Sequence, residues 1–194
     1  MFRQAFNAYF IEVKHSITAA CSWVIIGYYM NKDEFYAELK RDLNALIAGE
    51  NNFIATLSNA SALLYERLEG VNWAGFYLLD GSSLVLGPFQ GKIACVRIPV
   101  GKGVCGTAVA ENRVQRVGDV HAFPGHIACD ASSNAEIVLP VTVNGTVIGV
   151  LDIDSTVYQR FDEADEQGLT ELVAGLCQHL QNSDAAKYVN LIVS

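Results

Sequence analysis

The residues best suited to chemistry in this sequence lie between positions 125 and 154. Cys129 is in a stretch of small and polar residues, 125–130, where a thiol has little apolar surface around it to bury. Its sulfur is therefore expected to be reachable, which suits redox chemistry or metal ligation. Three acids follow it along the chain, Glu136, Asp152 and Asp154. We take this set as the centre around which the rest of the chain is organised.

Asp152 and Asp154 alternate with aliphatic residues, so a strand would place both carboxylates on one face. Two carboxylates this close repel each other. Either one keeps its proton and serves as an acid, or both bind a cation such as an ammonium or a metal. The alternative is the solvent face of a half-buried strand. The sequence leaves both interpretations open.

The position of Glu136 depends on the register of the hairpin that carries the two aspartates. Asn144-Gly145 is the favoured pair for a type I′ turn and predicts that hairpin. A regular ladder would pair Glu136 with Ile153 and turn its carboxylate to the opposite face. Because Pro140 has no N–H and commonly marks a bulge, we predict either a one-residue slip there or a Glu136 that precedes the paired segment.

The five cysteines include no Cys-X-X-Cys pair. Their odd number and their spacing match neither a secreted disulfide framework nor a standard zinc site, so a cytoplasmic location and no metal are predicted. Cys95, Cys105 and Cys129 border glycine-rich or polar segments and are expected in loops or turns. These three are the redox candidates, whereas Cys177 has the pattern of a buried core thiol.

Composition limits the partners of the chain. The sequence has 13 basic and 21 acidic residues, a formal net charge of -8, which argues against nucleic acid or an anionic membrane as a partner. A small ligand or a protein is expected instead. An apolar content of 51% over 194 residues predicts one globular domain with a sizeable core.

Residues 1–30 are expected to form an N-terminal extension. Their apolar run, 17–29, is shorter than the ~20 residues that span a bilayer, and few basic residues precede it. Three interpretations stay open: an upstream start codon with Met30 as the true start, a poorly ordered or partner-binding arm, or an uncleaved signal. Residues 31–182 are assigned to the domain and 183–194 to a C-terminal tail.

The elements that position the candidate residues follow from hydrophobic periodicity. Two helices are expected before the sheet, with Leu46 and Ile54 on their buried stripes, and a last helix is expected to begin at Asp162 as its N-cap. The strands are joined as hairpins, so the sheet is predicted to be mainly antiparallel and the class α+β. Residues 118–134 form an unusually long loop, which favours a functional role.

Trp73 and Tyr77 are four residues apart in the first predicted strand and share one face with Gly75. Most aromatic residues in strands are core residues. These two are nevertheless candidates for the wall of a pocket that takes an apolar part of a ligand.

Several motifs together resemble the free methionine-(R)-sulfoxide reductases, a family of single GAF-domain enzymes. In chain order they are Asn72-Trp73-Ala74-Gly75-Phe76-Tyr77, Gly87-Pro88-Phe89-Gln90-Gly91, Gly103-Val104-Cys105-Gly106, His126-Ile127-Ala128-Cys129-Asp130, Ser133-Asn134-Ala135-Glu136-Ile137-Val138 and Gly149-Val150-Leu151-Asp152-Ile153-Asp154-Ser155. The resemblance runs from about Met30 to the last helix. It implies a GAF-like α+β fold, an antiparallel sheet with helices packed on it, and a homodimer.

The resemblance also implies roles for the candidate residues. Cys129 would attack the sulfoxide through a sulfenic acid intermediate, Cys95 would resolve it as an intramolecular disulfide, and Cys105 would be a third redox-active thiol. The order of Cys105 and Cys129 stays open. The residues implied to hold the substrate are Glu136, Asp152, Asp154, Trp73 and Tyr77. Thioredoxin would be the external reductant, with no bound cofactor; the alternative is a non-catalytic GAF module that binds a small ligand or senses redox state.

Overall fold

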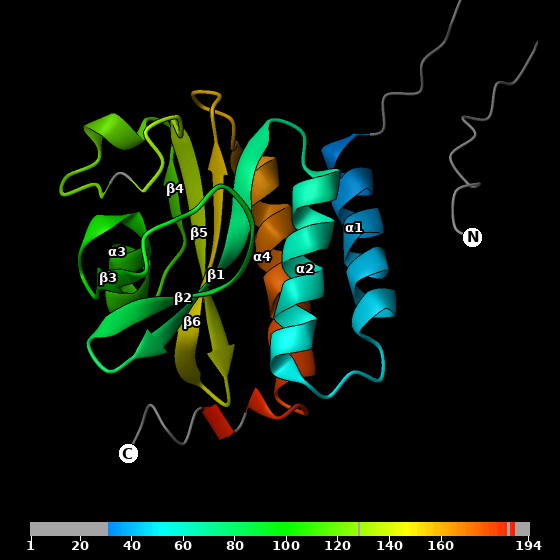
Figure 1. Cartoon of the computed structure of the whole chain (residues 1–194). Coiled ribbons are helices and arrows are strands. Elements are labelled where there is room, and N and C mark those ends of the chain that lie inside the picture. Colours follow the sequence, from blue (N-terminus) through cyan, green and yellow to red (C-terminus); the bar gives the residue numbers. More distant parts are fainter. Residues whose placement is uncertain (1–30, 128, 186, 189–194) are drawn as a thin grey trace, which may run out of the picture.

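The computed structural model describes residues 31–127, 129–185 and 187–188 (Figure 1). The predicted extension, 1–30, lies outside the described residues. The elements are α1 (Lys32–Ile47), α2 (Phe53–Arg67), β1 (Val71–Asp80), β2 (Ser83–Gly91), β3 (Arg97–Pro99), α3 (Gly103–Glu111), β4 (Gln115–Val117), the 3₁₀ turn η1 (Val120–Ala122), β5 (Ala135–Val143), β6 (Thr146–Ser155) and α4 (Glu163–Leu180).

The strands form one six-stranded sheet in the order β3-β2-β1-β6-β5-β4, and every neighbouring pair is antiparallel. Helices α2 and α4 pack on one face of the sheet, and α1 packs on α4 and α2 (Figure 1). The other face is covered by α3 and by the long loops. The α+β class and the antiparallel sheet are therefore confirmed.

Side-chain caps fix where three of the helices begin. Asn31 accepts a hydrogen bond from the Glu34 amide at the start of α1, and Asn52 does the same for α2. Asp162 is the N-cap of α4, as predicted, and forms a reciprocal capping box with Asp165. Each cap satisfies amide groups that the first turn of a helix leaves without a partner.

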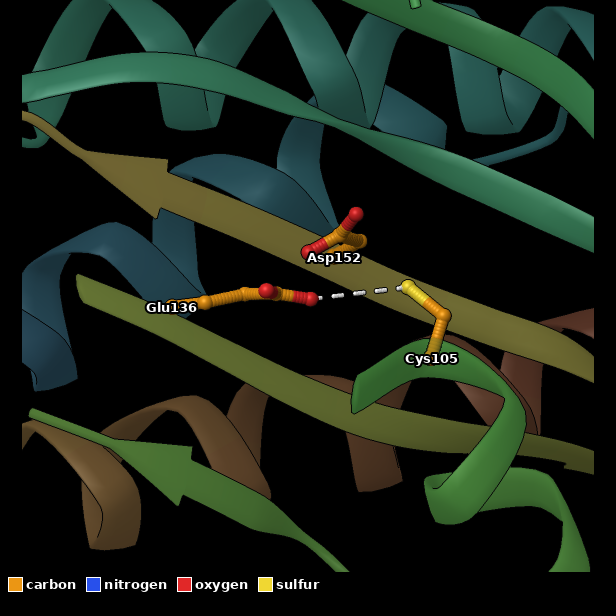
Figure 2. Close-up of side chains that lie close together, drawn as sticks. All are labelled: Cys105, Glu136 and Asp152. Atoms are coloured by element: carbon orange, nitrogen blue, oxygen red, sulfur yellow. Dashed lines mark hydrogen bonds between the residues drawn. The ribbon is translucent and has the colours of Figure 1, made fainter. Parts of the chain in front are cut away.

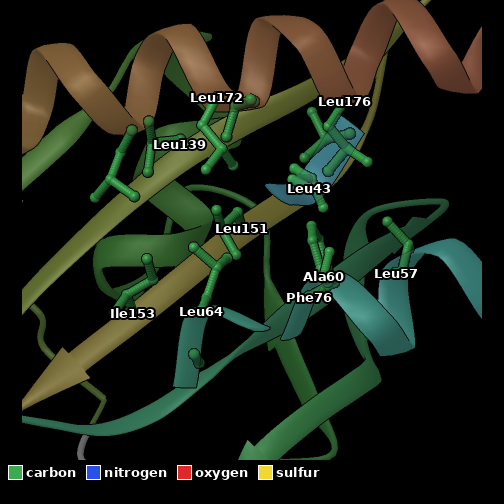
Figure 3. Close-up of a cluster of buried hydrophobic side chains, with 14 of the residues drawn as sticks. Leu43, Leu57, Ala60, Leu64, Phe76, Leu139, Leu151, Ile153, Leu172 and Leu176 are labelled. Atoms are coloured by element: carbon green, nitrogen blue, oxygen red, sulfur yellow. The ribbon is translucent and has the colours of Figure 1, made fainter. Parts of the chain in front are cut away.

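The larger core lies between the sheet and helices α1, α2 and α4, and Figure 3 shows part of it. Alternate residues of the strands enter this core and leave the residues between them for the opposite face. Leu46 and Ile54 do not belong to it, contrary to the prediction, because both are 45% exposed. Tyr36 on α1 and Phe53 on α2 are buried in it instead.

The β5–β6 hairpin contains the predicted turn and the predicted slip. Asn144 and Gly145 have φ values of 51° and 79°, the left-handed conformations that a type I′ turn requires. Val141 pairs with Gly149 but Thr142 pairs with Val147, so Ile148 is an extra residue in β6. The bulge lies one residue beyond Pro140, and it pairs Glu136 with Asp154.

The described residues of the C-terminal tail pack on the domain. Asp184 accepts a hydrogen bond from the Phe53 amide at the start of α2, and the Tyr188 hydroxyl donates to the Leu79 carbonyl. Over the part of the chain that the structure describes, none of the helices is both long enough and apolar enough to cross a bilayer.

Candidate active site

A partly open cavity lies on the α3 side of the sheet. It is enclosed by the start of β5 and the end of β6, the first turn of α3, the loop between η1 and β5, and Ile98 of β3. Among the described residues, its lining includes no lysine or arginine. The lining residues are Ile98, Gly103, Val104, Cys105, His126, Ile127, Cys129, Asp130, Ser133, Glu136, Asp152 and Asp154.

The register of the hairpin brings the three predicted acids together. Glu136 is paired directly with Asp154, and Asp152 is two residues before Asp154, so all three side chains leave the same face of the sheet. Figure 2 shows Glu136 and Cys105 pointing toward each other, with Asp152 beside them. The Cys105 thiol donates to Oε1 of Glu136 over 3.7 Å.

Burial controls the charge of this acidic cluster. It raises the pKa of Asp152 to about 6, and it raises the pKa of Glu136 well above its usual value, with the neighbouring aspartates adding to the effect. The pKa of Asp154 is raised too, first by burial and then by the charges of Asp152 and Asp130. Oδ1 of Asp152 is buried and has no hydrogen-bond partner within the described part of the chain. The cluster therefore holds protons at neutral pH and retains capacity to accept a donor.

Cys105 is less accessible than predicted. It lies in the first turn of α3, where the sequence indicates a short helix over residues 104–112, and it is only 3% exposed. Burial raises the pKa of its thiol, and the nearby charges of Asp152 and Glu136 raise it further. A thiol in this environment stays protonated, because burial and neighbouring carboxylates both disfavour the thiolate.

Cys95 and Cys129 are joined by a disulfide, with their Cα atoms 5.2 Å apart. Cys95 lies in the loop between β2 and β3, whereas Cys129 lies in the loop after η1 and lines the cavity. The disulfide thus joins two loops whose cysteines are 34 residues apart in sequence, and one of its sulfur-bearing residues lines the acidic cavity. Of the three candidate cysteines, this pair is the one within bonding distance.

Trp73 and Tyr77, predicted as pocket walls, are not among the residues that line the cavity. Both rings are buried beside it, and Trp73 stacks on both Tyr77 and Phe89. Gly75 allows this packing, because a Cβ there would lie 2.3 Å from Cβ of Phe89. The Trp73 indole N–H donates to the Lys92 carbonyl and the Tyr77 hydroxyl donates to the Cys95 carbonyl. These two side chains therefore hold the loop that carries Cys95.

The structure adds polar residues that sequence patterns did not single out. Asp130, next to Cys129, accepts hydrogen bonds from the hydroxyl and the amide of Ser132, and these bonds lower its pKa. Asn72 donates to both Asp130 and Ser133, which fixes the loop against β1. Their positions in the motifs around Trp73 and Cys129 were visible in the sequence. Their contact across 58 residues was not.

The first turn of α3 contributes partial positive charge to the cavity, opposite in sign to the carboxylates. Gly103, Val104 and Cys105 line the cavity, and the N-cap residue Lys102 makes no side-chain capping hydrogen bond. The first amides of a helix have no partner within the helix and carry partial positive charge. The cavity therefore has carboxyl groups on its sheet side and the first turn of a helix on the other side.

Three groups in the cavity have the geometry of metal ligands. Cys105, Glu136 and Asp152 each offer one ligand atom, and these atoms lie within 4.8 Å of one another. A thiolate with two carboxylates suits a divalent ion such as zinc. The prediction that the site works without a metal remains a prediction.

Comparison with known proteins identifies the class. The GAF domain family model matches residues 53–181. A solved structure of free methionine-R-sulfoxide reductase from Neisseria meningitidis in complex with its substrate superposes with a TM-score of 0.76 at 41% identity, covering 89% of this chain and 99% of that one. The reduced form of the Staphylococcus aureus enzyme superposes with a TM-score of 0.73 at 54% identity, covering 75% and 94%. This chain folds as a GAF domain.

The curated relatives narrow the class further. Free methionine-R-sulfoxide reductase of Escherichia coli is 69% identical, over 82% of this chain and 96% of that protein. The chain belongs to the free methionine-(R)-sulfoxide reductase family of GAF-domain oxidoreductases.

Proposed function

We propose that this protein reduces free L-methionine (R)-sulfoxide to methionine, with Cys129 as the nucleophile. One observation carries the proposal: Cys129 shares a cavity with three clustered carboxyl groups, and no described lysine or arginine lines it. A buried acidic cluster of this kind is completed by a cation from outside. The ammonium of a free amino acid supplies one, and family membership identifies the amino acid.

Both ends of a zwitterionic substrate find complementary groups. The ammonium pairs with Glu136, Asp152 and Asp154, where the unpartnered Oδ1 of Asp152 accepts one of its protons. The substrate carboxylate lies at the amides that open α3. A methionine sulfoxide inside a peptide has neither charge, so the site selects the free amino acid.

The acidic cluster also supplies the proton that the reaction needs. The Cys129 thiolate attacks the sulfoxide sulfur while a neutral carboxylic acid protonates the sulfoxide oxygen. Methionine is released and Cys129 becomes a sulfenic acid. Cys95 then attacks that sulfur, water leaves, and the Cys95–Cys129 disulfide forms. Two thiols lose two electrons and two protons, and the sulfoxide takes them up.

Cys105 and the aromatic pair Trp73 and Tyr77 have supporting roles in this proposal. Cys105 stays a protonated thiol that donates to Glu136, so Cys129 rather than Cys105 attacks first. Opening the disulfide releases the loop held by Trp73 and Tyr77 and lets these rings face the substrate side chain. Thioredoxin as the reductant, a homodimer and a cytoplasmic location belong to the proposal through the family resemblance.

The test is the fate of racemic sulfoxide. The protein is incubated with free L-methionine (R,S)-sulfoxide, thioredoxin, thioredoxin reductase and NADPH, and the remaining substrate is separated by chirality. We expect the R form to disappear and the S form to remain, with one NADPH oxidised for each methionine formed. N-acetylmethionine sulfoxide, which lacks the ammonium, is expected to react at least ~10²-fold more slowly.

The same assay separates the alternatives. A redox-sensing module would close its disulfide with peroxide and leave the sulfoxide untouched. A ligand-binding module would do neither. If N-acetylmethionine sulfoxide were consumed as fast as the free amino acid, the acidic cluster would not be the group that recognises the substrate.

A further inference from the structure

The loop between β2 and β3 has exposed aliphatic side chains on both sides of Cys95. Ile93 is 89% exposed and Val96 is 67% exposed, the two highest values among the large hydrophobic residues that the structure describes. Exposed apolar side chains that lie close together on a surface are typical of a protein-binding site. Here they flank one sulfur of the disulfide.

The segment that contains this loop, residues 90–102, is locally basic in an acidic protein. Residues 90–102 contain Lys92, Arg97 and Lys102 and no aspartate or glutamate, whereas the whole chain carries a net charge of -8. Lys92 lies 3.5 Å from Asp130 and Arg97 lies 3.1 Å from Asp80, but both side chains remain more than half exposed. An acidic protein surface is thus attracted to this loop and repelled by most of the rest of the molecule.

The two sulfurs of the disulfide have different surroundings. Cys129 lines the acidic cavity and is followed by Asp130, whose pKa is lowered and which is therefore ionised. Cys95 is not among the cavity-lining residues and lies in the basic loop. An attacking thiolate is an anion, so it approaches the Cys95 sulfur more favourably than the Cys129 sulfur.

We propose that Ile93 and Val96 form the docking surface for an acidic dithiol protein of the thioredoxin type, and that this partner attacks the sulfur of Cys95. The inference rests on the proposed function, because it concerns the disulfide formed in that reaction. The partner's thiolate bonds to Cys95 and expels the sulfur of Cys129, which takes a proton from the carboxyl groups of its cavity. The partner's second thiol then expels the sulfur of Cys95. The partner is oxidised by two electrons and Cys95 and Cys129 are reduced to thiols.

Kinetics with two reductants test the docking surface. The double variant Ile93→Ser, Val96→Ser is compared with the unchanged protein, using either thioredoxin or dithiothreitol as reductant. The KM for thioredoxin is expected to rise about tenfold or more, with turnover in dithiothreitol unchanged. The matched control is Ile54→Ser, because Ile54 is an exposed isoleucine on α2, on the other face of the sheet. It should change neither.

Failure of the two proposals gives different results. Normal turnover in dithiothreitol with an unchanged KM for thioredoxin would overturn the docking surface and leave the reductase function intact. Absence of turnover with either reductant in the unchanged protein would overturn the reductase function. Raised ionic strength should slow reduction by thioredoxin more than reduction by dithiothreitol, since only the former depends on charge steering.

A trapping experiment tests which sulfur is attacked. Thioredoxin whose second active-site cysteine is replaced by serine stops at the mixed disulfide with this protein. After acid quenching and proteolysis, mass spectrometry should find the thioredoxin peptide on Cys95. An adduct mainly on Cys129 would overturn the assignment of the attacked sulfur.

Discussion

Two buried acidic clusters in this molecule have opposite electrostatic states. Asp165, 1% exposed, lies in the first turn of α4, and Asp152, 5% exposed, lies in the sheet. The Asp165 carboxylate accepts hydrogen bonds from the Lys32 ammonium, the Tyr36 hydroxyl and the Arg160 guanidinium. Asp152 has acids and a thiol as neighbours, and its Oδ1 has no partner within the described residues. The charge of the Asp165 cluster is compensated by its own cations, and we call it the complete cluster. The Asp152 cluster has no such cation among the described residues, and we call it the incomplete cluster.

The pKa shifts follow from this difference. A hydrogen bond from Lys32 lowers the pKa of Asp162, the neighbour of Asp165, to about 2. Burial without a cation raises the pKa of Asp152 to about 6. The first cluster joins α1 to the start of α4 and serves stability. The second holds uncompensated acids in place for a charge that arrives from outside, which is what a binding site for an ammonium requires.

The largest expected effect comes from neutralising the incomplete cluster. Glu136→Gln keeps the shape of the side chain but removes its titratable proton and its negative charge. We expect kcat/KM for free methionine sulfoxide to fall about 10³-fold, the range for loss of a general acid and a charge partner. The free energy of unfolding at pH 8 should rise, because the folded state no longer has to keep protonated a buried carboxyl that ionises freely in the unfolded chain.

Steady-state kinetics and urea unfolding measure both quantities on the same samples. Asp162→Asn is the matched control, since Asp162 belongs to the completed cluster and does not line the cavity. It should leave kcat/KM unchanged. A Glu136→Gln protein with full activity would show that the two clusters do not differ in function.

The next effect comes from removing the centre of the complete cluster. Asp165→Ala leaves the Tyr36 hydroxyl and Arg160 without their shared acceptor. We expect a loss of about 3 kcal/mol in the free energy of unfolding, toward the low end for a broken buried pair because Lys32 is 42% exposed. Urea unfolding measures the loss, and kcat/KM should stay within about twofold. A stability change below ~1 kcal/mol would contradict the structural role of this cluster.

Sequence patterns predicted most of the framework because its determinants are local. The Asn144-Gly145 turn, the Asp162 cap and the pairing direction of the strands depend on neighbouring residues. The slip that turns Glu136 toward Asp152 was predicted from the missing N–H of Pro140, and the structure places it one residue further on. The prediction that Leu46 and Ile54 are buried was wrong, because helical periodicity alone cannot decide which edge of an apolar stripe the other elements cover.

The site was predicted less completely, because its contacts join distant segments. That Cys105 is buried follows from the packing of α3 on β5 and β6, which no local pattern reports. The hydrogen bonds from Trp73 and Tyr77 to the Cys95 loop likewise depend on the path of a loop. The acids and the cysteines were found because carboxyl and thiol groups are themselves reactive. Asn72, Ser132 and Ser133, which hold the loop after η1, have residue types that are common anywhere on a protein surface.

A third prediction concerns the dependence of stability on pH. The unfolded pKa of an aspartate is about 3.9, and the folded value for Asp152 is about 6, so the folded state binds more protons in between. The contribution is fully present below the unfolded pKa and is lost as pH rises through the folded pKa. Urea unfolding should show a loss of about 2 kcal/mol between pH 4 and pH 7 that Asp152→Asn removes. A slope that persists in Asp152→Asn would assign it to other groups.

The smallest expected effect tests whether the complete cluster is redundant. Tyr36→Phe removes the hydroxyl that donates to Oδ1 of Asp165 over 2.8 Å and keeps the ring in the core. Asp165 retains Lys32, Arg160 and the Asp162 amide as donors to its other oxygen, so its charge stays compensated. We expect a loss of about 1 kcal/mol, the usual net value of one hydrogen bond. Thermal unfolding checks it, and a loss near that of Asp165→Ala would mean that the hydroxyl, rather than the cations, holds the cluster together.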